Sequence, residues 1–379
     1  MTESTHDGPT SVRRWQVPGR VNLVGEHLDY NGGPSLPFAI DRFLTVKARA
    51  RDDDAVNAWS GGRKASFTTS VAPGDVDGWA AYVAGAVWAF GQAGHRLGGV
   101  DLVLEVDPKA GLPEGAGLSS SAALTVGVVS ALDDLAGTGL DGTTRAVVAQ
   151  RAENDFVGAP TGLMDQLAVV HGRAGHAVLT RPLADPPHTE PAPFDPPGAG
   201  LSLLVIDTGV DHSHAVHAET GGGYAQRREE CGRAAAELGL EHLADAGLDA
   251  VLRLQDETLK ARLRHVITET ARVTAAVRTL RDGDWSQLGT ILTASHESLR
   301  DDFEVSCAEL DVAVEAALEA GALGARMTGG GFGGSAIALA PQPKAAAVRE
   351  LIEHRYDALG WTPPTTFAVR AADGATRTH

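Results

Sequence analysis

The stretch GRVNLVGEHLDYNGG, residues 19–33, places five polar side chains within ten residues near the start of the chain, around the apolar Val21, Leu23 and Val24. The polar side chains are those of Arg20, Asn22, Glu26, His27 and Asp29. The apolar residues Val21, Leu23 and Val24 are of the types that most often lie in a protein core. We therefore expect the apolar residues to anchor this segment while its polar residues face a ligand.

Length and composition limit the class of protein. The chain has 379 residues, 43% of them hydrophobic, which predicts roughly two domains with a substantial core. The net charge of -17 argues against nucleic acid as a partner, because phosphate backbones are bound by an excess of Lys and Arg. We expect no membrane span, since no apolar run reaches about 18 residues, and no signal peptide, since the stretch MTESTHDGPTSVRR at the N-terminus lacks an apolar core of the required length. The two cysteines are too few for a disulfide framework or a zinc site, which favours a cytoplasmic protein.

Hydrophobic periodicity predicts mixed helices and strands in the first half of the chain. Residues 44–51 and 100–106 alternate between apolar and polar side chains and are predicted as strands. Residues 79–90 repeat apolar side chains at helical spacing, and a second helix is predicted to begin near the serines at 119–121. Because helices and antiparallel-type strands do not alternate regularly, we expect an α+β fold in two lobes rather than a doubly wound sheet.

The second half is predicted to begin after a long loop. Residues 182–197 contain seven prolines, whose fixed φ and missing N–H groups argue against regular structure, so we predict a loop near a domain boundary. We expect domains at 1–185 and 186–379, with the last strand able to pack back across the boundary. Gly321 is a C-cap candidate. The elements predicted beyond the loop are strands at 201–207, 335–340 and 365–371 and helices at 223–239 and 309–321.

The stretch GAGLSSSAAL, residues 115–124, places glycines and three serines directly before a predicted helix. A helix N-terminus offers unpaired N–H groups and the positive end of the macrodipole, and glycines allow a phosphate to approach closely. Simple N-capping by serine would explain one of the serines. Three serines after a flexible loop favour phosphate binding, although no Lys follows as in a Walker A loop.

The stretch RMTGGGFGG, residues 326–334, contains the spacing G-x-G-x-x-G at Gly329, Gly331 and Gly334. A dinucleotide-binding turn needs a helix after these glycines. The segment that follows is short and ends at Pro341, so it is predicted as a strand and an NAD-dependent oxidoreductase is a weak alternative. We predict instead a turn that passes close to a ligand or to another loop.

Three further groups have both a structural and a functional interpretation. Asp165, in GLMDQLAVVHG, is by itself best explained as a helix cap or a satisfied buried group, with acid–base chemistry as the alternative. Glu153 could be a solvated helix carboxylate, or a Mg²⁺ ligand together with a hydroxyl and phosphate oxygens. His212, His214 and His217 could bind a metal but are better explained as an exposed loop.

Taken together, these stretches resemble the galactokinases, within the GHMP kinases of sugars and small metabolites. Residues 19–33, 115–124 and 326–334 are similar to the three family motifs, and the stretches between them follow in family order. These are ENDFVGAPTGLMDQ, YAQRREEC, RHVITET and SHESLRDDFEVSCAELD. The resemblance implies a two-lobed fold with ATP and sugar in the cleft between the lobes. It also implies transfer of the ATP γ-phosphoryl group to the anomeric hydroxyl of α-D-galactose, the first committed step of galactose metabolism.

The same resemblance implies a role for individual residues. Arg20 and Asp165 match the catalytic pair, in which Asp165 orients or deprotonates the attacking hydroxyl and Arg20 steadies charge. Positions that match sugar ligands are Glu26, His27, Leu28, Asp29, Gly162 and Tyr224. Positions that match the phosphate loop are Gly115, Ala116, Gly117, Leu118, Ser119, Ser120 and Ser121. Ser121 and Glu153 match Mg²⁺ ligands, and Ser60 and Trp79 match the adenine side loosely.

Three departures from the family pattern leave alternatives open. Leu28 stands where Thr is usual, Thr125 replaces a common Glu, and the loop before Tyr224 is long, which weakens that assignment. The alternatives to a galactokinase are a catalytically silent sensor of galactose and ATP, and a related kinase that acts on another sugar. We expect a monomer or a weak homodimer whose only ligands are small molecules.

Overall fold

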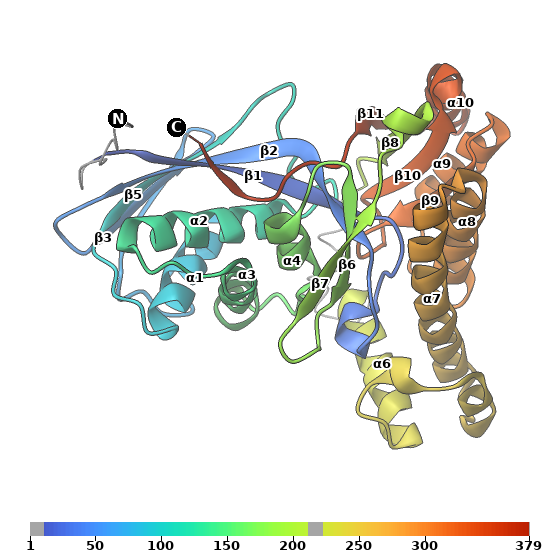
Figure 1. Cartoon of the computed structure of the whole chain (residues 1–379), viewed down its shortest axis with the longest axis horizontal. Coiled ribbons are helices and arrows are strands. Elements are labelled where there is room, and N and C mark those ends of the chain that lie inside the picture. Colours follow the sequence, from blue (N-terminus) through green and yellow to red (C-terminus); the bar gives the residue numbers. More distant parts are fainter. Residues whose placement is uncertain (1–10, 211–222, 379) are drawn as a thin grey trace.

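The computed structural model describes residues 11–210 and 223–378 and contains two larger sheets and one small one (Figure 1). The first sheet has six strands in the order β12-β1-β2-β5-β3-β4. The strands are β1 (Arg13–Asn22), β2 (Pro37–Ala50), β3 (Ala55–Ser60), β4 (Arg63–Thr68), β5 (Val100–Val106) and β12 (Thr376–Thr378). Helices α2 (Ser120–Ala136) and α4 (Met164–His171) pack on this sheet, and α1 (Trp79–Gln92), α3 (Gly142–Arg151) and a π-helical turn, η2 (Ala152–Val157), pack against these helices.

The second sheet has four antiparallel strands in the order β11-β8-β10-β9. They are β8 (Leu201–Asp207), β9 (Gly324–Thr328), β10 (Ser335–Pro341) and β11 (Thr365–Val369). The helices of this part are α6 (Tyr224–Leu238), α7 (Glu257–Asp282), α8 (Trp285–Asp301), α9 (Ala308–Glu319) and α10 (Ala345–Ala358). Short 3₁₀ turns are η1 (Asp29–Asn31), η3 (Pro197–Ala199), η4 (Leu243–Asp245), η5 (Leu248–Arg253) and η6 (Gln342–Lys344). The α+β class expected from the periodicity is confirmed.

The predicted strands and helices correspond to observed elements with small shifts at their ends. In β2, Leu44, Val46 and Ala48 are buried on one face, as the alternation predicts. The prediction of Gly321 as the C-cap of α9 is off by one residue. Helix α9 ends at Glu319, Ala320 is the C-cap residue, and Gly321, at φ +97°, directly follows the cap. Gly321 still fills the left-handed position after the helix that favours glycine.

The prediction of a structureless loop over residues 182–197 is wrong in its centre. Residues His188–Pro193 form β7, which pairs antiparallel with β6 (His176–Arg181) in a two-stranded sheet. Pro191 and Pro193 are two positions apart, so the missing N–H groups fall on the same side of the strand. A strand with a partner on only one side tolerates proline there, because no ladder hydrogen bond is lost.

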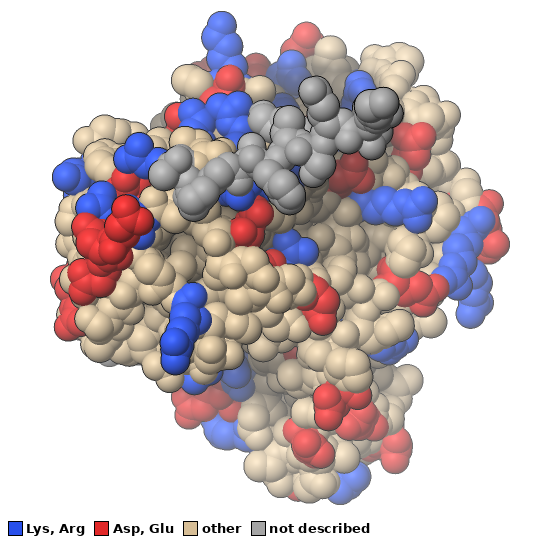
Figure 2. All heavy atoms as spheres, turned by 60° about the vertical axis from the view of Figure 1, so that its left-hand side comes forward, with Lys and Arg blue, Asp and Glu red and all other residues tan. Residues whose placement is uncertain are grey.

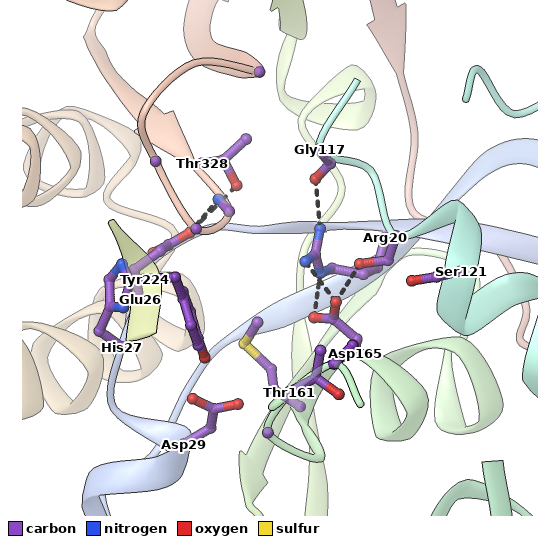
Figure 3. A pocket seen from close by; sticks show the side chains of 18 of the residues that line it. Arg20, Glu26, His27, Asp29, Gly117, Ser121, Thr161, Asp165, Tyr224 and Thr328 are labelled. Atoms are coloured by element: carbon purple, nitrogen blue, oxygen red, sulfur yellow. Dashed lines mark hydrogen bonds and ion pairs between the residues drawn. The ribbon is translucent and has the colours of Figure 1, made fainter. Parts of the chain in front are cut away.

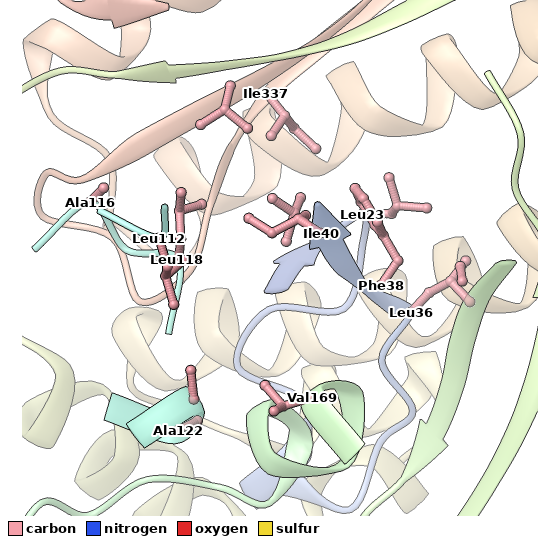
Figure 4. Packing of buried hydrophobic residues seen from close by; sticks show 14 of the residues in the cluster. Leu23, Leu36, Phe38, Ile40, Leu112, Ala116, Leu118, Ala122, Val169 and Ile337 are labelled. Carbon is pink, nitrogen blue, oxygen red and sulfur yellow. The ribbon is translucent and has the colours of Figure 1, made fainter. Parts of the chain in front are cut away.

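One continuous hydrophobic core contains residues that belong to, or directly adjoin, all three sequence motifs. Leu23 from the end of β1, Leu118 from the serine loop and Ile337 from β10 all belong to it and are at most 1% exposed (Figure 4). Val21 and Val24 are fully buried as well, as expected for anchors of the first motif. This shared packing holds three segments that are far apart in the sequence against one another.

The surface carries both signs of charge. In the view of Figure 2, acidic and basic side chains of the described residues are interspersed. Several of them form exposed ion pairs across neighbouring strands, such as Lys47 with Glu105 and Arg49 with Asp101. Within residues 11–210 and 223–378, no helix is both long and apolar enough to cross a bilayer.

Candidate active site

The three sequence motifs meet around one cleft. Its wall includes Arg20, Glu26, His27 and Asp29 from the first motif and Asp165 from the first turn of α4. Figure 3 shows the first-motif residues Glu26, His27 and Asp29 on one side and Arg20 with Asp165 across from them. The other lining residues are Gly115, Gly117, Ser119, Ser120, Ser121, Ala159, Pro160, Thr161, Gly162, Met164, Tyr224, Thr328, Gly329, Gly330, Gly331, Gly333 and Gly334.

Arg20 and Asp165 form a bidentate ion pair at the centre of this cleft. The Arg20 Nε and Nη2 atoms donate to Asp165 Oδ1 and Oδ2 at 2.6 and 2.7 Å. The third nitrogen, Nη1, donates to the Gly117 carbonyl at 2.8 Å, so the same guanidinium also holds the serine loop. The Asp165 side chain remains 21% exposed, against 7% for Arg20, which leaves the carboxylate accessible to a ligand. The interpretation of Asp165 as a helix cap is therefore wrong, because its carboxylate binds the Arg20 guanidinium beside it and the N-cap residue of α4 is Leu163.

The serine loop is not an ordinary N-cap. Ser119 precedes α2 in a left-handed conformation, at φ 57°, and its side chain makes no capping hydrogen bond. Its hydroxyl donates instead to Asp165 Oδ2. The N–H groups at the start of α2 are thus left without a side-chain cap, next to Ser120 and Ser121 in the cleft wall. A helix start with free N–H groups is suited to bind phosphate oxygens.

Glu26 is held by the glycine-rich turn of the third motif. Its Oε1 accepts from the Gly329 N–H at 3.1 Å and from the Thr328 hydroxyl at 3.3 Å. Its Oε2 forms an ion pair with Arg326 in β9, and both side chains are at most 2% exposed. Burial raises the pKa of Glu26, although Arg326 opposes this effect. The carboxylate is thereby fixed at the cleft wall by partners from the second sheet.

His27 presents a neutral ring to the cleft. Burial, together with the nearby His265, lowers the pKa of His27 to about 3. Its Nδ1 is hydrogen-bonded to the Tyr30 hydroxyl at 2.9 Å, and its Nε2 is buried without a hydrogen-bond partner in the described part of the chain. A buried polar atom of this kind is costly unless a ligand satisfies it.

Asp29 lies against Gly162 and has a raised pKa. Burial and the nearby Asp165 raise the pKa of Asp29 to about 6. Its Oδ1 accepts from the Tyr30 N–H at 3.0 Å. A methyl group added at Gly162 would overlap Asp29 Oδ2 and lie 3.0 Å from Oδ1, so only glycine leaves room for this carboxylate.

Tyr224 completes this side of the cleft at the start of α6. Its ring contacts His27 and Tyr30 with centroid distances of 5.3 and 5.6 Å. The long segment before it includes His212, His214 and His217, which lie outside the described residues. The described residues contain no group of three or more His, Cys, Asp or Glu side chains arranged to hold a metal.

Glu153 lies behind Ser121 and is 1% exposed. Its Oε1 accepts from the Gln166 amide at 2.8 Å and from the Thr125 hydroxyl at 3.0 Å. Burial raises the pKa of Glu153 to about 7, while hydrogen bonds from Gln166, Thr125 and Ser121 oppose the shift. A carboxylate next to a serine hydroxyl at the phosphate loop is the kind of oxygen donor set that suits Mg²⁺.

A second hollow adjoins the serine loop. Ser60, Trp79, Tyr82 and Glu114 line it, and it shares Ser120 and Ser121 with the cleft. The Arg63 guanidinium lies 5.3 Å from the centre of the Trp79 ring and forms an ion pair with Glu114. The structure thus brings Ser60 and Trp79 next to the serine loop.

Besides Glu153 behind the serine loop, and Ser60 and Trp79 in the second hollow, three more of the expected site residues do not line the cleft. Leu28, Ala116 and Leu118 are at most 1% exposed and belong to the core. The carbonyl groups of Leu118 and Ala116 accept from the Arg20 N–H and the Ser335 hydroxyl, so both residues support the loop through the backbone. The Leu28 side chain therefore packs in the core and is not part of the cleft wall.

Arg326 and Thr328 are among the contributors that the sequence interpretation missed, as are the lining residues Thr161 and Met164. A signal for Arg326 exists, because a charged residue between Ala325 and Met327 in a buried strand requires a counter-charge. The glycines that follow form the hairpin loop between β9 and β10, which pair antiparallel. A strand therefore follows the G-x-G-x-x-G spacing, and the dinucleotide-binding alternative is wrong.

Comparisons with known proteins agree with this geometry. Residues 3–50 match the galactokinase galactose-binding signature, residues 81–173 the GHMP kinases N terminal domain and residues 276–357 the GHMP kinases C terminal. The chain is 45% identical to a galactokinase of Streptomyces coelicolor, over 96% of this chain and 93% of the relative. It is 43% identical to a galactokinase of Mycobacterium tuberculosis, over 95% and 97%.

Among solved structures, a Lactococcus lactis galactokinase complexed with galactose superimposes with a TM-score of 0.89 at 30% identity. The match covers 97% of this chain and 95% of that one. A mevalonate kinase shares the fold, with a TM-score of 0.68 at 16% identity over 96% and 100% of the two chains. A cleft built from three motifs, and relatives that span nearly the whole length, lead to one conclusion: this chain belongs to the galactokinases of the GHMP kinase family.

Proposed function

We propose that this cleft transfers the γ-phosphoryl group of ATP to the anomeric hydroxyl of α-D-galactose, forming galactose 1-phosphate and ADP. The observation that carries the proposal is the bidentate pair of Arg20 and Asp165, which lies between the first-motif wall and the serine loop. A sugar bound on one side and a triphosphate on the other would meet at this pair. The likeness to a galactokinase complexed with galactose supports the choice of sugar.

The sugar side is proposed to consist of Glu26, His27, Asp29, Gly162 and Tyr224. The two carboxylates can each accept hydrogen bonds from sugar hydroxyls, and the unpartnered Nε2 of His27 supplies a further polar contact. These groups are nearly fully buried, so a sugar epimer that fails to satisfy one of them leaves a buried polar group unpaired. Such sites discriminate strongly between epimers.

The nucleotide side is proposed to begin at the start of α2. The uncapped N–H groups and the hydroxyls of Ser120 and Ser121 would bind phosphate oxygens. The adjoining hollow, with Ser60 and Trp79, would accept the adenine. Because the two hollows share both serines, one ATP molecule could occupy them together.

Phosphoryl transfer depends mainly on positioning and on neutralising charge. Asp165 would orient the anomeric hydroxyl and receive its proton, while Arg20 stabilises the charge that develops on the transferred group. The hydroxyl of Ser119, which donates to Asp165, would help to set which carboxylate oxygen faces the sugar.

We propose that Ser121 and Glu153 hold Mg²⁺ next to the phosphates. When bound, Mg²⁺ supplies positive charge that neutralises the phosphate oxygens. The residues fit this ion because both offer hard oxygen ligands and because Glu153 is oriented by Gln166 and Thr125. Thr125, where a Glu is common in the family, thus supports the carboxylate of Glu153.

We also propose lobes at residues 1–185 and 186–379. The two larger sheets lie on either side of this division, apart from β12, which returns to pair with β1, while the β6–β7 hairpin spans it. A cytoplasmic location and a monomeric or weakly dimeric state remain predictions from the sequence.

A coupled ADP-release assay across a panel of hexoses tests the activity. We expect Mg·ATP-dependent turnover with galactose and much lower kcat/KM with glucose and mannose. Saturable galactose binding without ADP release would support the silent sensor and contradict the kinase. A better substrate elsewhere in the panel would identify a kinase for another sugar.

A further inference from the structure

The loop that carries the sugar-binding side chains, residues 25–29, has a backbone that needs external support. Gly25 and His27 both have positive φ, at 105° and 61°, and the latter is unusual for a residue with a side chain. The loop connects the end of β1 to η1 without being part of a sheet. Partners outside the loop must therefore hold this conformation in place.

Two residues one turn apart on α7 hold the backbone of this loop. Glu269 Oε1 accepts from the Gly25 N–H at 2.8 Å, and His265 Nε2 is hydrogen-bonded to the Glu26 carbonyl at 3.3 Å. Their spacing of four positions places both side chains on the same helix face. Both belong to the stretch RHVITET, residues 264–270, to which the proposed reaction assigns no role.

The side chain of Glu269 is itself fixed by two neighbours. It accepts from the Ser295 hydroxyl at 2.7 Å and from Arg272 Nε at 2.6 Å, and it is fully buried. Burial alone would raise the pKa of Glu269, but Arg272 and other neighbours lower it to about 2. The acceptor of the Gly25 N–H is thus a charged carboxylate with a single orientation, and such charge-assisted bonds are stronger than neutral ones.

The ring of His265 has a defined tautomer. Burial lowers the pKa of His265 to about 4, so the ring is neutral. The carbonyl of Glu26 can only accept, which places the proton on Nε2, and Nδ1 then accepts from the Ser298 hydroxyl at 2.9 Å. Phe303 contacts the rings of His265 and His27 at centroid distances of 4.5 and 4.7 Å, which extends the support to the His27 ring.

We propose that His265 and Glu269 are positioning residues that set the geometry of galactose binding through the backbone of Gly25 and Glu26. Neither residue lines the cleft, so they act on the sugar only through this loop. Because Glu26 and His27 project from the loop, a small backbone shift moves two sugar contacts at once. The nucleotide side, built on α2, has no bond to either residue among those described. The inference rests on the proposed function.

The test compares paired variants at each position. His265→Leu removes the donor to the Glu26 carbonyl, whereas His265→Gln can restore one. Glu269→Ala removes the acceptor of the Gly25 N–H, whereas Glu269→Gln retains an acceptor. Leu280→Ala serves as the control, because Leu280 is buried on the same helix about three turns beyond Glu269. Galactose KM, ATP KM, kcat and melting temperature are measured for all five.

We expect His265→Leu and Glu269→Ala to raise the galactose KM about tenfold, as for a buried group left unpaired. ATP KM and kcat at saturating galactose should change little, and the glutamine variants should recover most of the affinity. The control should lower the melting temperature and leave galactose KM unchanged.

The inference is overturned if His265→Leu keeps the galactose KM of the wild type. It is also overturned if ATP KM rises in proportion, or if Leu280→Ala raises galactose KM as much at a similar loss of melting temperature. If Glu269→Ala fails to fold, the comparison of His265→Leu with His265→Gln decides the test by itself. Wild-type turnover with galactose, measured first, tests the proposed function separately from this comparison.

Discussion

Substitution of Gly162 by alanine tests the sugar side of the cleft with a single methyl group. The new Cβ would overlap Asp29 Oδ2 and lie 3.0 Å from Oδ1. Because ordinary C···O contacts are about 3.3–3.6 Å, the carboxylate has to move by about 2 Å. Gly162 does not have a positive φ, so alanine is compatible with its backbone and the effect is confined to Asp29.

A displacement of about 1 Å at a site that positions substrate can cost roughly 100-fold in activity. We therefore expect Gly162→Ala to lower kcat/KM for galactose by about 100-fold, mainly through KM. ATP KM should stay close to that of the wild type. The assay is coupled ADP release with galactose varied at saturating Mg·ATP, together with thermal unfolding.

Gly232 provides a matched control. It lies in α6, has no neighbour within 4 Å of an added Cβ and does not have a positive φ, so Gly232→Ala should be neutral or slightly stabilising. The double variant of Gly162→Ala with Asp29→Ala should be no worse than Asp29→Ala alone, because both changes affect one contact. A wild-type galactose KM in Gly162→Ala, or full additivity in the double variant, would refute the reasoning.

Three further predictions concern the carboxylates of the cleft. Asp165→Asn should preserve the fold, checked by circular dichroism, and lower kcat by about two orders of magnitude or more; near-normal kcat would exclude the assigned role. Glu26→Ala should raise galactose KM and leave ATP KM largely intact, and it should also lower the melting temperature because Arg326 loses its counter-charge; an unchanged galactose KM would remove Glu26 from the sugar site. The pKa of Asp29 is raised to about 6, so its carboxylate becomes protonated and accepts fewer hydrogen bonds as the pH falls through about 6. We expect kcat/KM for galactose to fall over the same pH range. A pH profile that is the same in Asp29→Asn would contradict this assignment.

Much of the fold follows from local patterns in the sequence. The alternation in residues 44–51 and 100–106 and the helical spacing in 79–90 reflect one buried face each, and such a face is visible in a single segment. The strand at His188–Pro193 is not visible in this way. Its prolines argue against a strand unless one knows that the strand has a partner on only one side, which is a fact of tertiary structure.

The candidate site, like the fold, is only partly predictable from local patterns in the sequence. Arg20, Asp165 and the serines stand in recognisable motifs, and the structure brings them into one cleft. The hydrogen bonds that join them link segments 46 to 145 residues apart in the sequence. That Ser119 donates to Asp165 rather than capping α2 depends on the distance between two helices, which no local pattern encodes.

The ion pair of Glu26 with Arg326 has a consequence for how the protein can be divided. Arg326 Nη1 also donates to the Leu23 carbonyl, so one side chain near the end of the chain neutralises and secures a segment near its beginning. A fragment that stopped before β9 would lose the cation that neutralises Glu26 and the donors that hold its carboxylate, which destabilises an already marginally stable fold. We therefore expect the sugar site to form only when nearly the whole polypeptide is present. Separately expressed halves should bind sugar only after they reassemble.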